Sequence, residues 1–242
     1  SALVTATYEY DSEGSPNIPQ IDLVLTSTPV VARPRKLRAR YSLEASANLR
    51  RVHGLDAETE LSAVMAEELK FEIDREIIDQ LFGVAGAGTV SFSKTPPAGV
   101  SYNDHKQAFV DTMIEAGNLI FEKTRRAQAN WIVLGTDAAN IVESLPGFVP
   151  SGITGTMGVL RTGMLNGRWT CYKDPYVGRS NFLVGYKGLS WLETGFVYAP
   201  YIPLFMTQSV TLDDFISRKG IGTSYAKKIV NNKFYVSGTV SA

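Results

Sequence analysis

Residues 33–82 read RPRKLRARYSLEASANLRRVHGLDAETELSAVMAEELKFEIDREIIDQLF. The first part is basic, and its cations are Arg33, Arg35, Lys36, Arg38 and Arg40. The second part is acidic, and only Lys70 and Arg75 oppose Asp56, Glu58, Glu60, Glu67, Glu68, Glu72, Asp74, Glu76 and Asp79. The whole chain is neutral, with 24 basic and 24 acidic residues, so its charge is separated into two adjoining segments of opposite sign. Such separation favours a surface that meets a copy of itself, positive part against negative part.

The acidic part predicts a long helix from Asp56 to Phe82. Acidic residues lie in its first turn, where the helix dipole favours them, and Gly83 supplies a stop. About 27 residues give a length of roughly 40 Å. Apolar residues recur every four positions, at Leu61, Met65, Leu69, Ile73, Ile77 and Leu81. Each step turns about 400°, so the apolar stripe drifts around the axis and the two ends should contact different elements. An ordinary core helix with a solvated acidic face is the alternative.

The basic part predicts an edge strand. Lys36, Arg38 and Arg40 alternate with Leu37, Ala39 and Tyr41, so one face is basic and the other apolar. Pro29 and Pro34 are typical of edge or arm geometry, because proline cannot donate to a sheet. Two interpretations remain open. The charges either protect an exposed edge against stray pairing or form a contact with another subunit.

The remaining chain predicts a mixture of helices and strands. Helices are expected at Ser42–Val52, with Ser42 as its cap, at Asp104–Arg125 and at Thr136–Ser144. Asn166-Gly167 is a strong hairpin signal and should join strands Val159–Leu165 and Arg168–Tyr172. Ser217–Thr223 is expected to be a turn. Further strands are expected at Ile21–Leu25, Asn130–Leu134, Phe182–Tyr186, Gly195–Ala199, Leu204–Val210 and Phe234–Val240.

Composition excludes several classes of protein. The single cysteine, Cys171, rules out an internal disulfide framework and a multi-cysteine metal site. Neutral net charge argues against a dedicated nucleic-acid binder, which is usually basic as a domain. No apolar run is long enough to span a bilayer, so no membrane partner is expected. The chain begins with Ser1 in place of Met, which fits a processed or trimmed product.

Motifs for catalysis are absent from the sequence. There is no Gly-Lys-Ser/Thr phosphate loop and no Gly-x-Ser-x-Gly nucleophile elbow. His53 and His105 lie far from each other and from Cys171 along the chain. We therefore expect no enzyme activity, no catalytic residue, no cofactor and no metal. A soluble α/β enzyme, for example one with a glycosidase-like carboxylate pair, stays as an alternative of a different class.

Eight ordered segments resemble a known family. They are Arg38–Glu44 (RARYSLE), Val52–Leu61 (VHGLDAETEL), Glu72–Asp79 (EIDREIID), Asn130–Val133 (NWIV), Tyr172–Tyr176 (YKDPY), Leu183–Gly188 (LVGYKG), Tyr198–Leu204 (YAPYIPL) and Tyr225–Lys228 (YAKK). In this order they resemble the major capsid protein of T4-like tailed bacteriophages. The resemblance extends from about residue 30 to about residue 230. The ordered set is far more specific than any one segment.

The resemblance implies an α+β chain with the HK97-like capsid fold, which tailed-phage shells share with encapsulins. This fold has a long spine helix, a peripheral domain with an extended loop, and an axial α/β domain. Mapped onto this sequence, residues 1–45 would form the N-terminal segment and extended loop. Residues 46–100 would form the peripheral domain, with the spine helix at 56–82. Residues 101–208 would form the axial domain, and residues 209–242 would return to the peripheral domain, ending with a strand in its sheet.

The resemblance also implies a structural function. The chain would assemble with itself into the pentamers and hexamers of an icosahedral virion head that encloses double-stranded DNA, formed in the host cytoplasm. Scaffold, portal, vertex and decoration proteins would be further partners, and basic residues would contact DNA without sequence specificity. An encapsulin-like compartment is the alternative within this fold. The predicted subunit-interface residues are Arg33, Arg35, Lys36, Arg38, Arg40, Glu67, Glu68, Glu72, Asp74 and Glu76.

Overall fold

A computed structural model describes residues 27–126, 128–152 and 158–241. Contacts between residues divide the chain into Ser1–Val30 and Val31–Ala242, and the second unit contains all the described helices and strands. The helices are α1 (Leu43–His53), α2 (Ala57–Gly83), α3 (Tyr102–Thr124) and α4 (Thr136–Glu143), with 3-10 turns at Trp191–Glu193 and Asn232–Phe234. The strand expected at Ile21–Leu25, and residues 1–26 of the expected N-terminal segment, lie outside the described residues.

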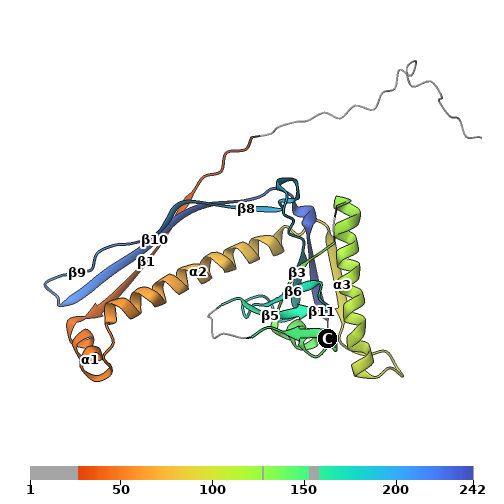
Figure 1. The fold of residues 1–242 in the computed structure, drawn as a ribbon, viewed down its shortest axis with the longest axis horizontal. Helices are drawn as coiled ribbons and strands as arrows, with labels where there is room; N and C mark the ends of the chain where they lie inside the picture. Colours follow the sequence, from red (N-terminus) through yellow and green to blue (C-terminus); the bar gives the residue numbers. More distant parts are fainter. Residues whose placement is uncertain (1–26, 127, 153–157, 242) are drawn as a thin grey trace, which may run out of the picture. The chain divides into compact units, whose positions relative to one another are not determined.

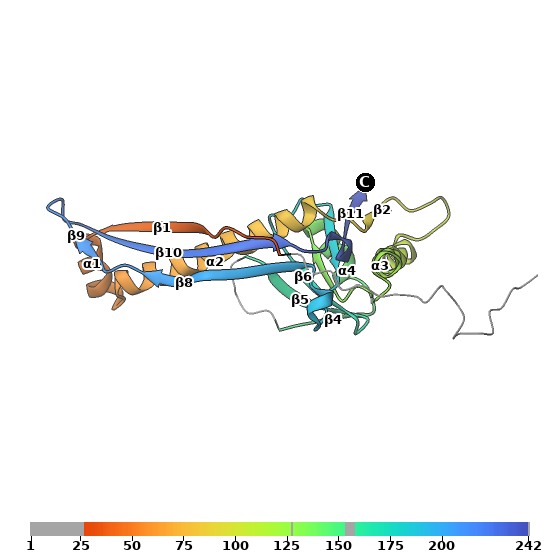
Figure 2. The same cartoon turned by 90° about the horizontal axis from the view of Figure 1, so that it is seen from above.

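The first sheet contains β1 (Arg33–Ser42), β8 (Phe196–Met206), β9 (Val210–Thr211) and β10 (Ile216–Ile229). Its order is β1-β10-β8, with β9 also paired to β10, and all these pairs are antiparallel. Figure 1 shows α2 running beside these strands, and Figure 2 shows β1, β10 and β8 side by side. As Pro29 before the strand and Pro34 within it predict, β1 is an edge strand.

Local signals fix both helices that follow β1. The hydroxyl of Ser42 accepts a hydrogen bond from the backbone N–H of Ala45, and Gly54 ends α1 with φ +67°. The carboxylate of Asp56 accepts one from the N–H of Thr59 and caps α2. Side-chain caps satisfy N–H groups that a helix leaves free at its start. Both predicted helices are confirmed to within one residue at each end.

The two ends of α2 pack against different parts of the molecule. Met65 and Leu69 form a small buried cluster with Ile221 of β10. Ile78 and Leu81, further along the same helix, belong to the large core around the second sheet. The drift of an apolar stripe with a period of four residues produces this change of partner. The expectation that the helix contacts different elements at its two ends is confirmed.

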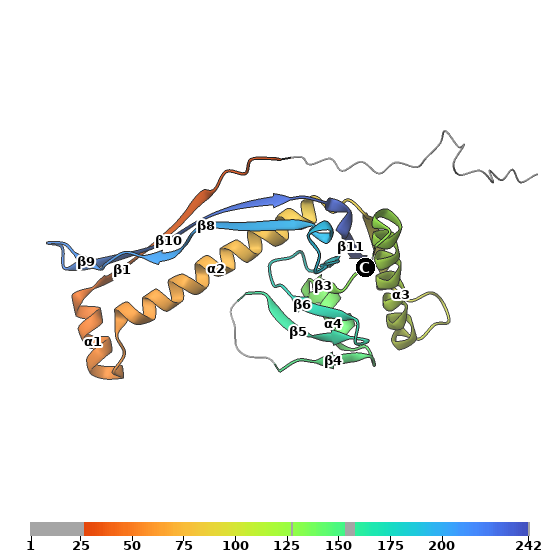
Figure 3. The ribbon, with the colours of Figure 1, turned by 45° about the horizontal axis from the view of Figure 1, so that its top comes forward.

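The second sheet has seven strands in the order β2-β11-β7-β3-β6-β5-β4. Its strands are β2 (Gly88–Ser93), β3 (Trp131–Leu134), β4 (Phe148–Pro150), β5 (Leu160–Leu165), β6 (Trp169–Lys173), β7 (Asn181–Gly185) and β11 (Tyr235–Ser241). Two pairs, β2 with β11 and β3 with β6, are parallel. Helix α3 lies against β2, β7 and β11 (Figure 3), and its Phe109 meets Phe92 and Phe182 edge-on at about 5 Å.

The predicted hairpin at Asn166-Gly167 is confirmed. Both residues have left-handed backbone angles, φ +51° and +65°, and they join antiparallel strands β5 and β6. Two successive positive φ values define the type I′ turn, whose twist matches that of the strands it joins.

Two predictions about the late strands are wrong. Gly195–Ala199 and Leu204–Val210 were expected as separate strands, but β8 runs continuously through Pro200 and Pro203. Proline is tolerated there because β8 is an edge strand, and the pairing with β10 shifts register beside Ser224. The expected turn at Ser217–Thr223 lies inside β10. Both of its glycines pair with β1, and Gly222 also pairs with β8, so they are held extended.

At three strands, the sheets also differ from the residue ranges that the sequence analysis gave for the domains. The final strand was expected in the sheet beside the spine helix, but β11 lies between β2 and β7 in the second sheet. Its Val236 is fully buried, and Val240 is 6% exposed, so it needs the larger core. In addition, β2 falls within the range 46–100 but joins the second sheet, and β8 falls within 101–208 but joins the first.

We predict that Leu69→Ala lowers the free energy of unfolding by about 2–5 kcal/mol, because the side chain is 1% exposed and its loss leaves a cavity beneath the first sheet. Val64→Ala on the same helix is the matched control and should change it by less than about 0.5 kcal/mol, since Val64 is 56% exposed. Urea denaturation of the unassembled chain measures both variants. Equal losses would contradict the packing described for α2.

Candidate subunit interface

Strand β1 divides the basic residues between two faces. Its burial alternates, with Arg35, Leu37, Ala39 and Tyr41 half-buried on the side of α2. Lys36, Arg38 and Arg40 are exposed and lie on the opposite face, because neighbouring side chains on a strand point to opposite sides. The basic row that the alternation predicts therefore exists on the face of the sheet turned away from α2.

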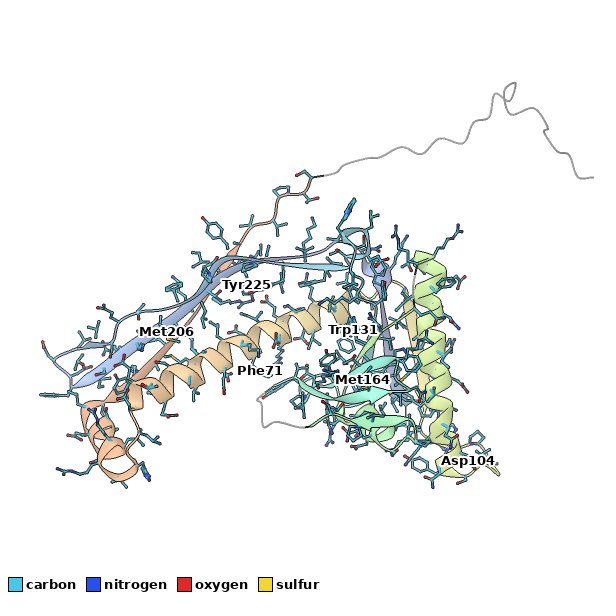
Figure 4. All side chains as sticks on the ribbon, viewed as in Figure 1. Phe71, Asp104, Trp131, Met164, Met206 and Tyr225 are labelled. Carbon is cyan, nitrogen blue, oxygen red and sulfur yellow. The ribbon has the colours of Figure 1, made fainter. Side chains whose placement is uncertain are left out.

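Arg35 connects β1 to the acidic helix of its own chain. Its Nη1 lies 3.2 Å from Oε1 of Glu72, and its Nη2 lies 2.7 Å from Oε1 of Glu76. Glu76 also pairs with Nζ of Lys227 at 2.8 Å and accepts a hydrogen bond from the hydroxyl of Tyr225. Figure 4 shows Tyr225 on the strand ribbon above α2. Three of the ten predicted interface residues, Arg35, Glu72 and Glu76, are thus engaged within the chain.

This cluster shifts the pKa values of its members. Partial burial raises the pKa of Glu76, but the hydrogen bonds and positive charges of its partners outweigh burial. The pKa of Glu76 therefore lies below its usual value of 4.5. Burial, followed by the hydrogen bond to Glu76, raises the pKa of Tyr225 to about 12. At neutral pH the cluster therefore holds an ionised carboxylate and a protonated phenol, which suits the observed donor and acceptor.

The other predicted interface residues are distributed over several surfaces. Arg33 is exposed at the start of β1, and Glu67 and Glu68 are exposed on α2. Asp74 is half-buried and lines a groove of about 710 Å³ between α2 and β8, where burial raises the pKa of its carboxyl. Within the described residues, none of the seven candidates outside the Arg35 cluster forms an ion pair. Those seven are Arg33, Lys36, Arg38, Arg40, Glu67, Glu68 and Asp74.

Sequence reasoning missed the exposed apolar character of β8. Every residue from Val197 to Met206 is exposed, including Tyr201 at 75% and Leu204 at 48%. Contiguous apolar surface of this kind marks sites of protein association. The run of apolar residues was visible in the sequence. Its exposure was not, because a buried strand has the same composition.

The described residues offer little support for a metal site, a membrane-spanning helix or a reactive cysteine. No group of three or more His, Cys, Asp or Glu side chains there is placed to hold a metal ion. None of the described helices has the length and apolarity needed to cross a membrane. Cys171 is buried in the core, and burial raises the pKa of its thiol to about 11, which disfavours the reactive thiolate at neutral pH.

Solved structures with the same fold define the class of the molecule. The chain is similar to the mature capsid of bacteriophage PhiM1, with a TM-score of 0.57 and 11% identity, covering 98% of this chain and 79% of that one. It is also similar to the SrpI encapsulin of Synechococcus elongatus PCC 7942, with a TM-score of 0.53 and 11% identity, covering 86% and 74%. The predicted α+β HK97-like capsid fold is confirmed.

The chain belongs to the family of the major capsid protein Gp23, whose model matches residues 2–242. The major capsid protein of Vibrio phage KVP40 is 30% identical over 227 residues, covering 83% of this chain and 43% of that protein. That of Enterobacteria phage T4 is 28% identical over 219 residues, covering 81% and 42%. The chain therefore spans less than half the length of these relatives. Membership confirms the predicted family, which consists of structural virion proteins rather than enzymes.

We predict that Glu76→Gln destabilises the chain in a pH-dependent way. A depressed carboxyl pKa contributes stability that is present above the unfolded value of 4.5 and is lost as pH falls through the folded value. The variant should lose about 1–2 kcal/mol at pH 7, discounted for partial exposure, and the difference from wild type should shrink as the pH falls below 4.5 and through the lowered pKa of the folded state. Denaturation of the unassembled chain at several pH values measures this. A difference that stays constant with pH would contradict the role of the ionised carboxylate.

Proposed function

We propose that this chain is the shell-forming part of a tailed-phage major capsid protein and that it self-associates into the pentamers and hexamers of an icosahedral head. The observation that carries the proposal is the family match over residues 2–242. The likeness to an encapsulin concerns the fold alone, at 11% identity, so we favour the phage head over the compartment. An enzyme has no supporting constellation among the described residues.

In this proposal the first sheet and α2 form the peripheral domain, and the second sheet with α3 and α4 forms the axial domain. Support comes from the separate hydrophobic clusters on either side of α2. This assignment differs from the domain ranges expected from the sequence. It places β2 and β11 in the axial domain and β8 in the peripheral domain. The side chain of Phe71 helps to connect the two parts. It projects away from the first sheet (Figure 4) and meets Tyr176, with ring centres 4.8 Å apart.

Self-association would use two kinds of surface. The exposed apolar side chains of β8 would supply buried area, which drives most protein association. The exposed charges of β1 and α2 would set orientation and register, because isolated surface ion pairs contribute only a few tenths of a kcal/mol each. Repetition of the same contact around a ring multiplies these small contributions.

Contact with enclosed double-stranded DNA would be electrostatic and independent of sequence, through basic residues on the inner surface of the shell. Neutral net charge suits this function, since a strongly basic subunit would bind nucleic acid before assembly. Scaffold, portal, vertex and decoration proteins complete the proposed set of partners.

Negative-stain electron microscopy of the purified chain, with light scattering for size, tests the proposal. Closed shells, tubes or rings of five or six subunits would support it. A chain that stays a monomer or dimer at every salt concentration would contradict it.

We predict that Arg38→Glu combined with Arg40→Glu reduces assembly more than tenfold, because like charges brought together at an interface cost several kcal/mol. The unassembled variant should be at least as stable as wild type. Arg40 lies directly opposite Arg218 on β10, and the change replaces that repulsion with attraction. Microscopy measures assembly, and circular dichroism with urea denaturation measures folding. Normal particles from this variant would rule out an interface role for the basic row.

A further inference from the structure

Two residues of the basic row of β1 lie opposite glycines on the neighbouring strand β10. In the antiparallel register, Lys36 lies opposite Gly222, Arg38 opposite Gly220, and Arg40 opposite Arg218. Opposite residues of an antiparallel pair share a face, so these positions lie together on the side of the sheet turned away from α2. With no side chain on either glycine, the surface beside the cations is hollowed.

The hollow is a groove of about 510 Å³, which we call the basic groove. Its lining includes Lys36, Arg38 and Arg218 on the charged side, and Phe205 and Val210 on the apolar side. The ring of Phe205 leans over the glycine floor, where a Cβ added to Gly222 would come within 2.9 Å of it. Within the described residues, two cations of the lining are paired: Arg218 with Asp214 at 2.7 Å, and Lys219 with Glu58 of α2 at 2.9 Å. Lys36 and Arg38 form no ion pair there.

The charge arrangement of the basic groove is unfavourable in the isolated chain. Arg40 and Arg218 lie directly opposite each other, a like-charged pair that destabilises a sheet. Asp214 compensates Arg218, whereas the cations of Lys36, Arg38 and Arg40 meet no acid in the described chain. An anionic group from outside would remove this repulsion.

A matching surface exists on the first half of α2. Val64 is 56% exposed, and Glu60, Glu67 and Glu68 lie three or four residues from it, which makes them its neighbours on the helix surface. At about 100° per residue, Glu60 and Glu67 point to the side of the helix opposite Leu69, which contacts the first sheet. We call these four residues the acidic patch: Glu60, Val64, Glu67 and Glu68.

We propose that the basic groove of one copy receives the acidic patch of a second copy, with Val64 against the apolar wall and the glutamates against the cations. This inference rests on the proposed self-assembly and names the surfaces that it uses. Charge complementarity supports it, because a neutral chain carries both surfaces, and Lys36, Arg38 and the three glutamates of the acidic patch form no ion pair within the described residues. The two surfaces differ, so the contact is head-to-tail and generates a ring where the rotation closes.

Protein fits the basic groove better than nucleic acid does. Phosphate groups are bound by cations and polar hydrogen-bond donors, and they gain nothing from an apolar wall. Phe205 and Val210, both exposed, form such a wall beside the cations. A protein surface with an apolar side chain surrounded by acidic ones can contact both the apolar wall and the cations of the groove.

A charge-swap experiment tests the pairing. One variant carries Lys36→Glu and Arg38→Glu, and the other carries Glu67→Lys and Glu68→Lys. Each alone should lose more than nine-tenths of the particles that wild type forms, because groove and patch then carry the same sign. An equimolar mixture should regain rings of six, since alternating variants bring the reversed groove of one against the reversed patch of the other and the unchanged groove against the unchanged patch. A ring of five cannot alternate and keeps one like-charged contact, so closed particles are expected to return less fully than rings of six. A chain carrying all four changes should also assemble.

The control variant Arg51→Glu with Lys123→Glu makes the same change in net charge as the groove variant, at exposed sites outside both surfaces, and it should assemble as wild type does. Failure of wild type to assemble would overturn the proposed function itself. If wild type assembles and the two variants also assemble alone, or stay unassembled when mixed, the pairing of groove with patch is wrong. Normal assembly of the Lys36/Arg38 variant with lost retention of added DNA would assign the groove to nucleic acid instead, and would equally overturn the pairing.

Discussion

The packing of α2 against two separate hydrophobic clusters is the constraint on which the rest of the structure depends. Leu69 and Met65 hold the first sheet, whereas Ile78 and Leu81 belong to the core of the second. One rigid helix therefore fixes both sheets, since its two contact surfaces cannot turn relative to each other. The same drift leaves the outer side of its first half without a partner among the described residues, and the exposed acids lie there.

Side chains along β1 alternate between the two faces of the sheet, and this alternation determines which of its cations form ion pairs within the chain. Arg35 has the same parity as Leu37 and meets Glu72 and Glu76, so part of the opposite charge seen in the sequence is an intramolecular contact. Residues of the other parity cannot reach α2, because strand side chains alternate between faces. The interface hypothesis therefore applies to fewer residues than the sequence indicated, and to a definite face of the sheet.

Local signals predicted much of the fold. The caps Ser42 and Asp56 and the Asn166-Gly167 turn act within a few residues, so their sequence suffices to locate them. The errors arose where distant strands determine the outcome. Gly220 and Gly222 resemble a turn, yet both pair with β1, and Gly222 also pairs with β8, so they stay extended. For the candidate site, the sequence indicated the charged segments and the alternation of β1, but only the packing of α2 against β1 shows that Arg35 meets Glu72 and Glu76.

The exposed edge strand β8 also bears on solubility. It presents a long apolar row with one backbone edge that no other described strand pairs, a combination that promotes pairing with any extended chain. Pro200 and Pro203 each remove a backbone donor from this strand, and the register shift beside Ser224 twists it locally. These prolines interrupt the continuous hydrogen-bond ladder that amyloid growth requires, and they leave the exposed side chains of the strand in place for the proposed assembly.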